Sequence, residues 1–213
     1  MPVLNILWAD TDQMALPSGA PLSAYRENKL ASIKHKQTRR CSLCAELLLI
    51  EAVRREAPDF PLPLVIEADS YGKPRFADRE FEFSLSHSTH FAACALSDSP
   101  IGLDIQSLAK CDERLVRRFF TQREQDVILS SKNRDAAFTR LWCRKESFLK
   151  AIGLGLRLPL DSFDLSDEDP TVSFREKAYG FREYRAEDLF FCICMPFDAL
   201  PENMDPQKVE LPF

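Results

Sequence analysis

Apolar residues recur at spacings of three and four along residues 138–152, and this spacing is typical of a helix with one buried face. The apolar positions are Phe138, Leu141, Trp142, Phe148, Leu149 and Ile152. Asn133 or Ser131 can cap the start of this helix, and Gly153 and Gly155 tolerate the left-handed backbone that commonly ends one. The pattern therefore predicts a long helix that ends near Gly153.

Two charged residues of this helix, Glu146 and Lys150, stand four positions apart. At about 100° of rotation per residue, their side chains project in the same direction. Taken alone, such a pair is most often an exposed ion pair that contributes little to stability. A catalytic interpretation needs support from other parts of the chain.

Alternating apolar and polar positions predict strands in both halves of the chain. The predicted strands cover residues 3–8, 64–68, 81–88, 91–96, 101–106, 172–174, 180–185 and 189–195. Residues 41–55 predict a second long helix, and residues 112–120 and 121–130 predict two short helices, the last with a capping box. The tail from Pro201 is expected to be loose.

The strand at residues 101–106 carries the second informative pattern. Alternation places Ile101, Leu103 and Ile105 on the core face and leaves Asp104 and Gln106 on the other face. Gly102 lacks a side chain, which lets a ligand or another backbone approach closely. The acidic face could equally be a solvated strand surface.

The overall composition fits a globular protein of one large or two small domains. A net charge of −5 provides no general attraction for nucleic acid. We expect a cytoplasmic protein, since there is neither a signal-peptide pattern nor an apolar run of eighteen residues. The seven cysteines are expected to be thiols, because their number is odd and the chain shows no export signal. The Cys41 and Cys44 pair lacks the further ligands of a zinc site.

Asp104, Gln106 and Glu146 form a set that offers only oxygen ligands. Such ligands suit Mg²⁺, which is typically held by one or two carboxylates together with water and substrate phosphate. Lys150 could neutralise phosphate charge, and Lys73, His87 and the basic segment 25–40 are further candidates. A solvated helix face for the basic segment and a structural role for His87 remain the simpler alternatives.

Six ordered motifs resemble those of the surfactin-synthetase-activating (Sfp) type of 4′-phosphopantetheinyl transferase. The two signature runs are PIGLDIQ at residues 100–106 and WCRKESFLK at residues 142–150. The other four are YGKP at 71–74, FSLSHS at 83–88, RFFTQRE at 118–124 and GLRLPLDSF at 155–163. The similarity is close from about Tyr71 to Phe163 and loose in the amino-terminal helices.

The resemblance implies an enzyme that moves the phosphopantetheine arm of coenzyme A to a serine of an apo acyl or peptidyl carrier protein, releasing adenosine 3′,5′-bisphosphate. It implies a monomer of the α+β class with two pseudo-symmetric halves, residues 1–103 and 104–213. Coenzyme A would bind in the cleft between the halves, with the metal site at their junction. The carrier could serve fatty acid, polyketide or peptide synthesis.

The resemblance also implies roles for individual residues. Asp104, Gln106 and Glu146 would hold Mg²⁺, with Mn²⁺ as a possible substitute. Glu146 would be the base for the carrier serine, and Lys150 would stabilise the departing phosphate. Gln106 departs from the acidic residue that many family members have at this position, and it leaves metal affinity and choice open.

Further residues match the family's coenzyme A contacts. They are Arg26, Lys29, Arg40, Lys73, Ser86, His87, Lys145 and Lys150. Arg114, Arg117 and Arg118 could meet an acidic carrier, although exposed arginines need no such purpose. Two other functions remain as alternatives, namely a catalytically silent module that binds coenzyme A and carrier protein, and a Mg²⁺-dependent phosphohydrolase.

Overall fold

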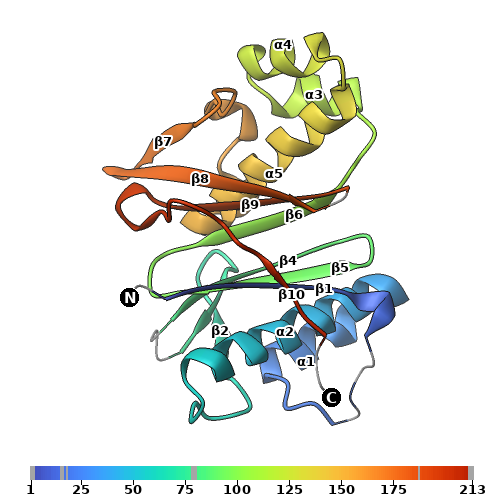
Figure 1. Ribbon diagram of the computed structural model, residues 1–213, viewed down its shortest axis with the longest axis vertical. Coiled ribbons are helices and arrows are strands. Elements are labelled where there is room, and N and C mark those ends of the chain that lie inside the picture. Colours follow the sequence, from blue (N-terminus) through green and yellow to red (C-terminus); the bar gives the residue numbers. More distant parts are fainter. Residues whose placement is uncertain (1–2, 15–16, 18, 78–80, 187, 211–213) are drawn as a thin grey trace.

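A computed structural model describes residues 3–14, 17, 19–77, 81–186 and 188–210. Two four-stranded sheets face each other in the middle of the molecule, and helices cover their outer sides (Figure 1). The protein therefore has the predicted α+β fold, arranged as helix, sheet, sheet and helix layers.

The first sheet has the strand order β10, β1, β5, β4. These strands span Gln207–Lys208, Leu4–Asp10, Phe91–Ser97 and Glu82–Ser88. Helices α1 (Ala24–Ser32) and α2 (Lys36–Glu56) belong to this half, and α2 packs its apolar face on the sheet. Helix α2 begins at Lys36, five residues before Cys41, where the sequence predicted its start. The basic segment 25–40 is therefore divided between α1 and α2.

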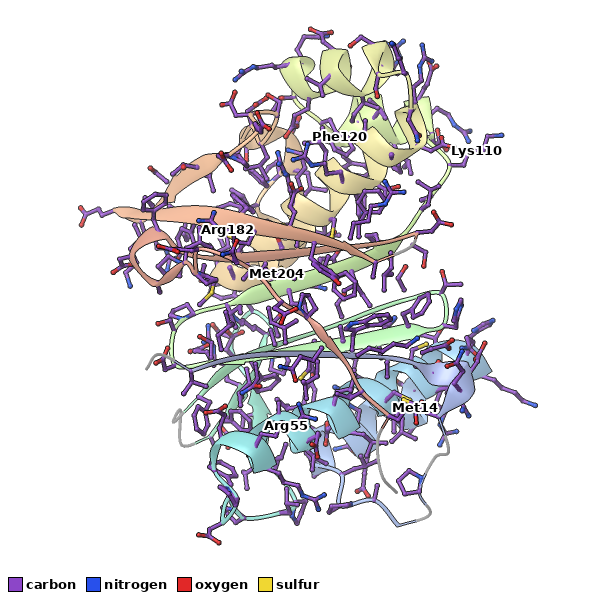
Figure 2. The ribbon with its side chains drawn as sticks, in the orientation of Figure 1. Met14, Arg55, Lys110, Phe120, Arg182 and Met204 are labelled. Carbon is purple, nitrogen blue, oxygen red and sulfur yellow. The ribbon has the colours of Figure 1, made fainter. Side chains whose placement is uncertain are left out.

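The second sheet has the order β6, β9, β8, β7. Its strands span Gly102–Ser107, Leu189–Pro196, Lys177–Ala186 and Thr171–Phe174. Helices α3 (Glu113–Phe119), α4 (Gln122–Ser130) and α5 (Arg134–Ile152) lie over its outer face, with Phe120 packed among them (Figure 2).

The predicted ends of α5 are confirmed. The Asn133 side chain accepts a hydrogen bond from the Ala136 amide, and Gly153 ends the helix with φ of 74°. The predicted capping box at Thr121 and Glu124 is also present at the start of α4. Local sequence therefore sets the boundaries of the helices that carry the second half.

Short elements complete the chain. Strands β2 (Ile66–Ala68) and β3 (Pro74–Phe76) form a hairpin around the predicted turn at residues 71–74. Single turns of 3₁₀ helix occur at Thr11–Gln13, Gly155–Arg157, Leu160–Ser162 and Phe197–Ala199.

An apolar layer fills the space between the two sheets. Ile101, Leu103 and Ile105 are fully buried in it, which confirms the predicted core face of β6. Trp8 of the first sheet meets Phe191 of the second in an edge-on contact, with ring centroids 5.5 Å apart. Burial of this layer from both sides holds the sheets together.

The prediction of a loose tail after Pro201 is wrong. Met204 is buried between the sheets (Figure 2), and the tail then adds β10 to the edge of the first sheet in parallel with β1. The amide of Val209 donates to the Trp8 carbonyl oxygen at 2.9 Å. Burial of Met204 and these backbone bonds order a segment that its prolines alone suggested to be irregular.

The predicted division of the chain at residues 103 and 104 stays a prediction. That boundary falls inside β6, all of which belongs to the second sheet, while β10 returns to the first sheet. Within the part of the chain that the structure describes, no helix is both long enough and apolar enough to cross a membrane. All seven cysteines are free thiols, as predicted.

Candidate functional site

A cavity of about 380 Å³ is lined by residues from both halves of the molecule. Arg26 and Lys29 reach it from α1, Ser84 to His87 from β4, and Asp104 from β6. Glu146 and Lys150 line it from α5, one helical turn apart as predicted, and Lys73 comes from the β2–β3 turn. The structure thus brings together most of the residues that the motifs single out.

Asp104 is held by three donors. Its Oδ1 accepts hydrogen bonds from the Lys150 ammonium at 2.7 Å and from the Ser86 hydroxyl at 2.8 Å. Its Oδ2 accepts from Gln106 Nε2 at 2.9 Å, and only 3% of the residue is exposed. A buried carboxylate with these partners is fixed in orientation.

Glu146 has a different environment on the same cavity. No hydrogen bond or ion pair joins its carboxylate to any residue in the described ranges. Burial and then the negative charge of Asp104 raise the pKa of Glu146, while Lys150 opposes the shift. Two carboxylates therefore share the cavity, and one is free to accept a proton or a cation.

Gln106 contacts Asp104 but does not belong to the cavity lining. Its amide nitrogen faces Asp104, an assignment that follows from the hydrogen-bond network. Among the described residues, no group of three or more His, Cys, Asp or Glu side chains could hold a metal ion. The two carboxylates and the neutral amide still form an oxygen donor set that fits Mg²⁺ when water and phosphate complete it.

Cationic side chains also line the cavity. His87 lies at the exposed mouth, where desolvation followed by the charges of Lys150, Lys29 and Arg26 lowers its pKa. Desolvation, Arg26 and Lys150 likewise lower the pKa of Lys29. Cations that disfavour one another's protonation favour an anion placed between them.

Arg26 and Lys73 line the cavity while bonding to protein groups. Buried Arg26 forms an ion pair with Glu46 at 3.0 Å and donates to Ser42 Oγ at 2.6 Å. Lys73 donates to the carbonyl oxygens of Ile101 and Ala151 at 3.3 and 3.2 Å. Desolvation lowers the pKa of Lys73 to about 8, although the charge of Glu82 opposes this shift.

Lys145 is the clearest correction to the expected contacts. Its ammonium is fully buried away from the cavity, 2.8 Å from Glu124, and it also donates to the carbonyl oxygens of Leu160 and Phe163. Adjacent helix residues point about 100° apart, so Lys145 faces the core while Glu146 faces the cavity. In this structure Lys145 stabilises the second half and does not line the cavity.

Arg40 also lies outside the cavity lining. Its guanidinium bonds to the carbonyl oxygens of Thr11 and Met14, and it thereby holds the segment after β1 against α2. The arginines of α3 are exposed and do not line the cavity either. Arg114 pairs with Asp112 at 3.3 Å and Arg117 with Glu113 at 3.9 Å.

Glu46 is the functional neighbour that sequence reasoning missed. It is fully buried and holds Arg26 together with the amide and hydroxyl of Ser23. The sequence places this glutamate inside the apolar run of residues 41–53. A charged side chain at a core position needs a partner, so this pattern could have predicted a buried ion pair. Ser42, on the same helix, completes this part of the cavity wall.

Comparison with known proteins gives a consistent family. Residues 100–194 match the model of the 4′-phosphopantetheinyl transferase superfamily, a range that includes Asp104, Gln106, Glu146 and Lys150. The transferase ffp of Bacillus subtilis is 34% identical over 157 residues, which are 71% of this chain and 70% of that protein. The transferase gsp of Aneurinibacillus migulanus is 34% identical over 70% of this chain and 65% of its own length.

A further relative, the transferase Sfp of Bacillus subtilis strain 168, is 32% identical over 68% of this chain and 66% of its own. The chain thus spans about two thirds of the length of these relatives. The solved structure of Thermotoga maritima holo-[acyl-carrier-protein] synthase gives a TM-score of 0.33 at 16% identity, covering 46% of this chain and 62% of that one. On the sequence comparisons, the chain belongs to the 4′-phosphopantetheinyl transferase superfamily, among the transferase enzymes of the Sfp type.

Proposed function

We propose that this protein transfers the 4′-phosphopantetheine arm of coenzyme A to a serine of an apo acyl or peptidyl carrier protein. The supporting observation is the cavity lined by both halves, where the Asp104 and Glu146 carboxylates share the lining with the cations of Lys29 and Arg26. A pyrophosphate carries several negative charges, and such a cavity supplies both cations and oxygen ligands for it. The names of the relatives support the choice of the transferred group.

The reaction makes one bond and breaks one. The carrier serine Oγ bonds to the phosphorus on the pantetheine side, and the bond to the bridging pyrophosphate oxygen breaks, releasing adenosine 3′,5′-bisphosphate. Glu146 accepts the serine proton, which its neighbours favour because burial and Asp104 raise its pKa. A serine hydroxyl is a weak nucleophile until such a base accepts its proton.

The cations of the cavity stabilise the charge that appears on the leaving group. Lys150 lies one turn beyond Glu146 on α5 and would face the departing phosphate. Lys29 and His87 at the mouth of the cavity would contact the 3′-phosphate of coenzyme A. Arg26, which is buried in the cavity wall, would also attract the phosphate charge. Glu46 holds the Arg26 guanidinium in place for this contact.

Asp104 and Glu146 would hold Mg²⁺, with Mn²⁺ as a possible substitute. The Gln106 amide, which donates a hydrogen bond to Asp104, would help to orient that carboxylate. Bound there, the ion would neutralise charge on the pyrophosphate. We further propose a cytoplasmic monomer that has no nucleic-acid partner, which the net charge of −5 supports.

The test combines the purified protein, Mg²⁺, coenzyme A and a panel of apo carrier proteins that represent fatty acid, polyketide and peptide synthesis. Mass spectrometry should show a carrier gaining the phosphopantetheine arm, and a chelator should abolish the gain. Binding of coenzyme A without transfer to any carrier would support a silent binding module. Cleavage of coenzyme A without an acceptor would instead support a phosphohydrolase.

A further inference from the structure

Four buried polar side chains join α1 to α2 in the wall of the cavity. The two helices lie side by side (Figure 1), and at most 3% of Ser23, Arg26, Ser42 or Glu46 is exposed. Glu46 Oε1 accepts a hydrogen bond from the Ser23 amide at 2.6 Å. Glu46 Oε2 accepts from the Ser23 hydroxyl at 3.1 Å and from Arg26 Nε at 3.0 Å. We call these contacts the Glu46 network.

The Glu46 network leaves one nitrogen of Arg26 for a ligand. Nε is held by Glu46, and Nη1 donates to Ser42 Oγ at 2.6 Å. Nη2 has no hydrogen-bond partner among the described residues, in which every fully buried side-chain nitrogen or oxygen does have one. Nη2 is therefore not fully buried. Since Arg26 lines the cavity and is otherwise covered by protein, this nitrogen faces the cavity.

Glu46 fixes the direction of this free nitrogen. A guanidinium stays charged in proteins, and removing it from water is costly unless an anion lies beside it. Glu46 supplies that anion, and the second contact with Ser42 fixes the plane of the guanidinium. Nη2 is thus oriented before any ligand arrives, so less conformational entropy is lost when it binds a phosphate.

The charge of Arg26 acts where Lys29 and His87 lie. Desolvation and then the charge of Arg26 lower the pKa of Lys29, which follows three residues later on α1. Desolvation, followed by the charges of Lys150, Lys29 and Arg26, lowers the pKa of His87. The three cations therefore act on one part of the cavity, and Lys29 and His87 are the groups assigned above to the 3′-phosphate.

From this arrangement we propose that Glu46 is a positioning residue that aims Arg26 Nη2 at the 3′-phosphate. In this role Glu46 lets the site select coenzyme A over 3′-dephospho-coenzyme A. The inference rests on the proposed function and deepens it, because it names a residue behind the choice of substrate.

Two simpler roles of Glu46 predict different results. A carboxylate that only offsets the charge of Arg26 weakens phosphate binding, so its removal would strengthen the binding of coenzyme A. A carboxylate that only holds α1 on α2 would affect both ligands alike when it is removed.

The test compares Glu46→Gln with Glu124→Gln. Both glutamates are fully buried, pair with a cation and accept hydrogen bonds from backbone amides, but Lys145, the partner of Glu124, does not line the cavity. Calorimetry without metal measures the affinity for coenzyme A and for 3′-dephospho-coenzyme A. Steady-state kinetics gives KM and kcat, and urea unfolding measures stability.

We expect Glu46→Gln to weaken coenzyme A binding by about tenfold or more, because a hydrogen bond to a charged phosphate is lost. The affinity for 3′-dephospho-coenzyme A should change little, and KM for coenzyme A should rise while kcat stays near the wild-type value. Glu124→Gln should lower stability and leave both affinities unchanged. Glu46→Asp, which keeps the charge, should recover part of the loss. If Glu46→Gln does not fold, Glu46→Asp replaces it and should show a smaller loss with the same selectivity.

A second comparison removes Arg26 itself. Glu46→Gln should cause no further loss of coenzyme A affinity when it is added to Arg26→Met, because Glu46 acts on the ligand through this arginine. The double variant thus measures the coupling between the two residues.

Three results would overturn the proposal. Equal losses for the two ligands would mean that Glu46 acts through the fold. Unchanged or tighter binding of coenzyme A would mean that Glu46 only offsets charge, and a loss that persists without Arg26 would mean that Glu46 does not act through it. Absence of carrier modification by the wild type would remove the proposed function, but the comparison of the two ligands would still decide the role of Glu46.

Discussion

Asp104 and Glu146 face the same cavity, yet neighbouring side chains hold only Asp104. Ser86, Gln106 and Lys150 all donate to Asp104, whereas Glu146 has no such partner within the described residues. Burial, and then the charge of Asp104, raises the pKa of Glu146. The Asp104 carboxylate is therefore fixed in orientation, whereas the Glu146 carboxylate is able to take a proton.

Replacing Glu146 by glutamine should nearly abolish carrier modification. The amide cannot accept the serine proton, and a positioned general base contributes about 10²- to 10⁴-fold to such a rate. The initial rate with a responsive carrier measures the loss, and circular dichroism checks the fold. Glu113→Gln on the exposed surface of α3 is the matched control and should leave the rate unchanged. Normal transfer by the Glu146 variant would remove this residue from the mechanism.

Replacing Lys145 by methionine should destabilise the protein without a direct effect on ligand binding. The Lys145 and Glu124 side chains are both fully buried, so the substitution leaves an unpaired buried carboxylate, which costs about 3 to 5 kcal/mol. Urea unfolding measures the change. Arg117→Met breaks an exposed pair and should cost less than about 1 kcal/mol. Unchanged stability with weakened coenzyme A binding would restore the phosphate contact expected for Lys145.

Lys73 should make stability depend on pH in the alkaline range. Its pKa is lowered from 10.5 to about 8 in the folded protein, chiefly by desolvation. Between these values the unfolded chain binds more protons, so this contribution to stability rises with pH, by an amount on the order of 3 kcal/mol. The neutral amine can still donate to the carbonyl oxygens of Ile101 and Ala151.

The measurement is the difference in unfolding free energy between the wild type and Lys73→Met, below about pH 8 and above about pH 10. The difference should move in favour of the wild type as the pH rises. Using a difference between two proteins removes the titration of other lysines and tyrosines. A constant difference would show that folding does not change the pKa of Lys73, and a difference that moves in favour of the variant would show that folding raises it; either result contradicts the prediction.

Gly102→Ala should be strongly destabilising. A Cβ at this position would lie 1.9 Å from the Ser147 carbonyl oxygen and 2.3 Å from the Ala151 amide nitrogen, so α5 would have to move away from β6. Overpacking against backbone costs about 3 kcal/mol or more. The sequence pattern allowed either a ligand or a backbone at this glycine, and the structure shows that the neighbour is α5.

The matched control is Gly155→Ala. Among the described residues, no atom would lie within 4 Å of a Cβ added at Gly155, apart from its chain neighbours. The φ of 54° at this position means that alanine would cost only backbone strain, about 1 to 2 kcal/mol of folding free energy. Thermal unfolding of both variants gives the comparison. Equal losses at the two positions would mean that the contact between α5 and β6 can relax.

Local patterns in the sequence were sufficient to predict the helix and the strand that carry Asp104, Glu146 and Lys150. The three- and four-residue spacing from Phe138 to Ile152 identified α5, and the alternation from Ile101 to Gln106 identified β6 with its core face. Periodicity works here because each element buries one face, so the sequence records which side is covered. The order of motifs likewise identified the family before any geometry was known.

The sequence alone determined which residue types occur at the site, and only the tertiary structure decided which of them face the cavity. Lys145 and Glu146 are neighbours in one motif, but the packing of α5 turns one to the core and the other to the cavity. Arg40 and the tail after Pro201 serve contacts between segments that are far apart in the chain. Ser84, Ser86 and Ser88 alternate along β4, but only the packing of the two sheets decides that their hydroxyls accept hydrogen bonds from amides of β6.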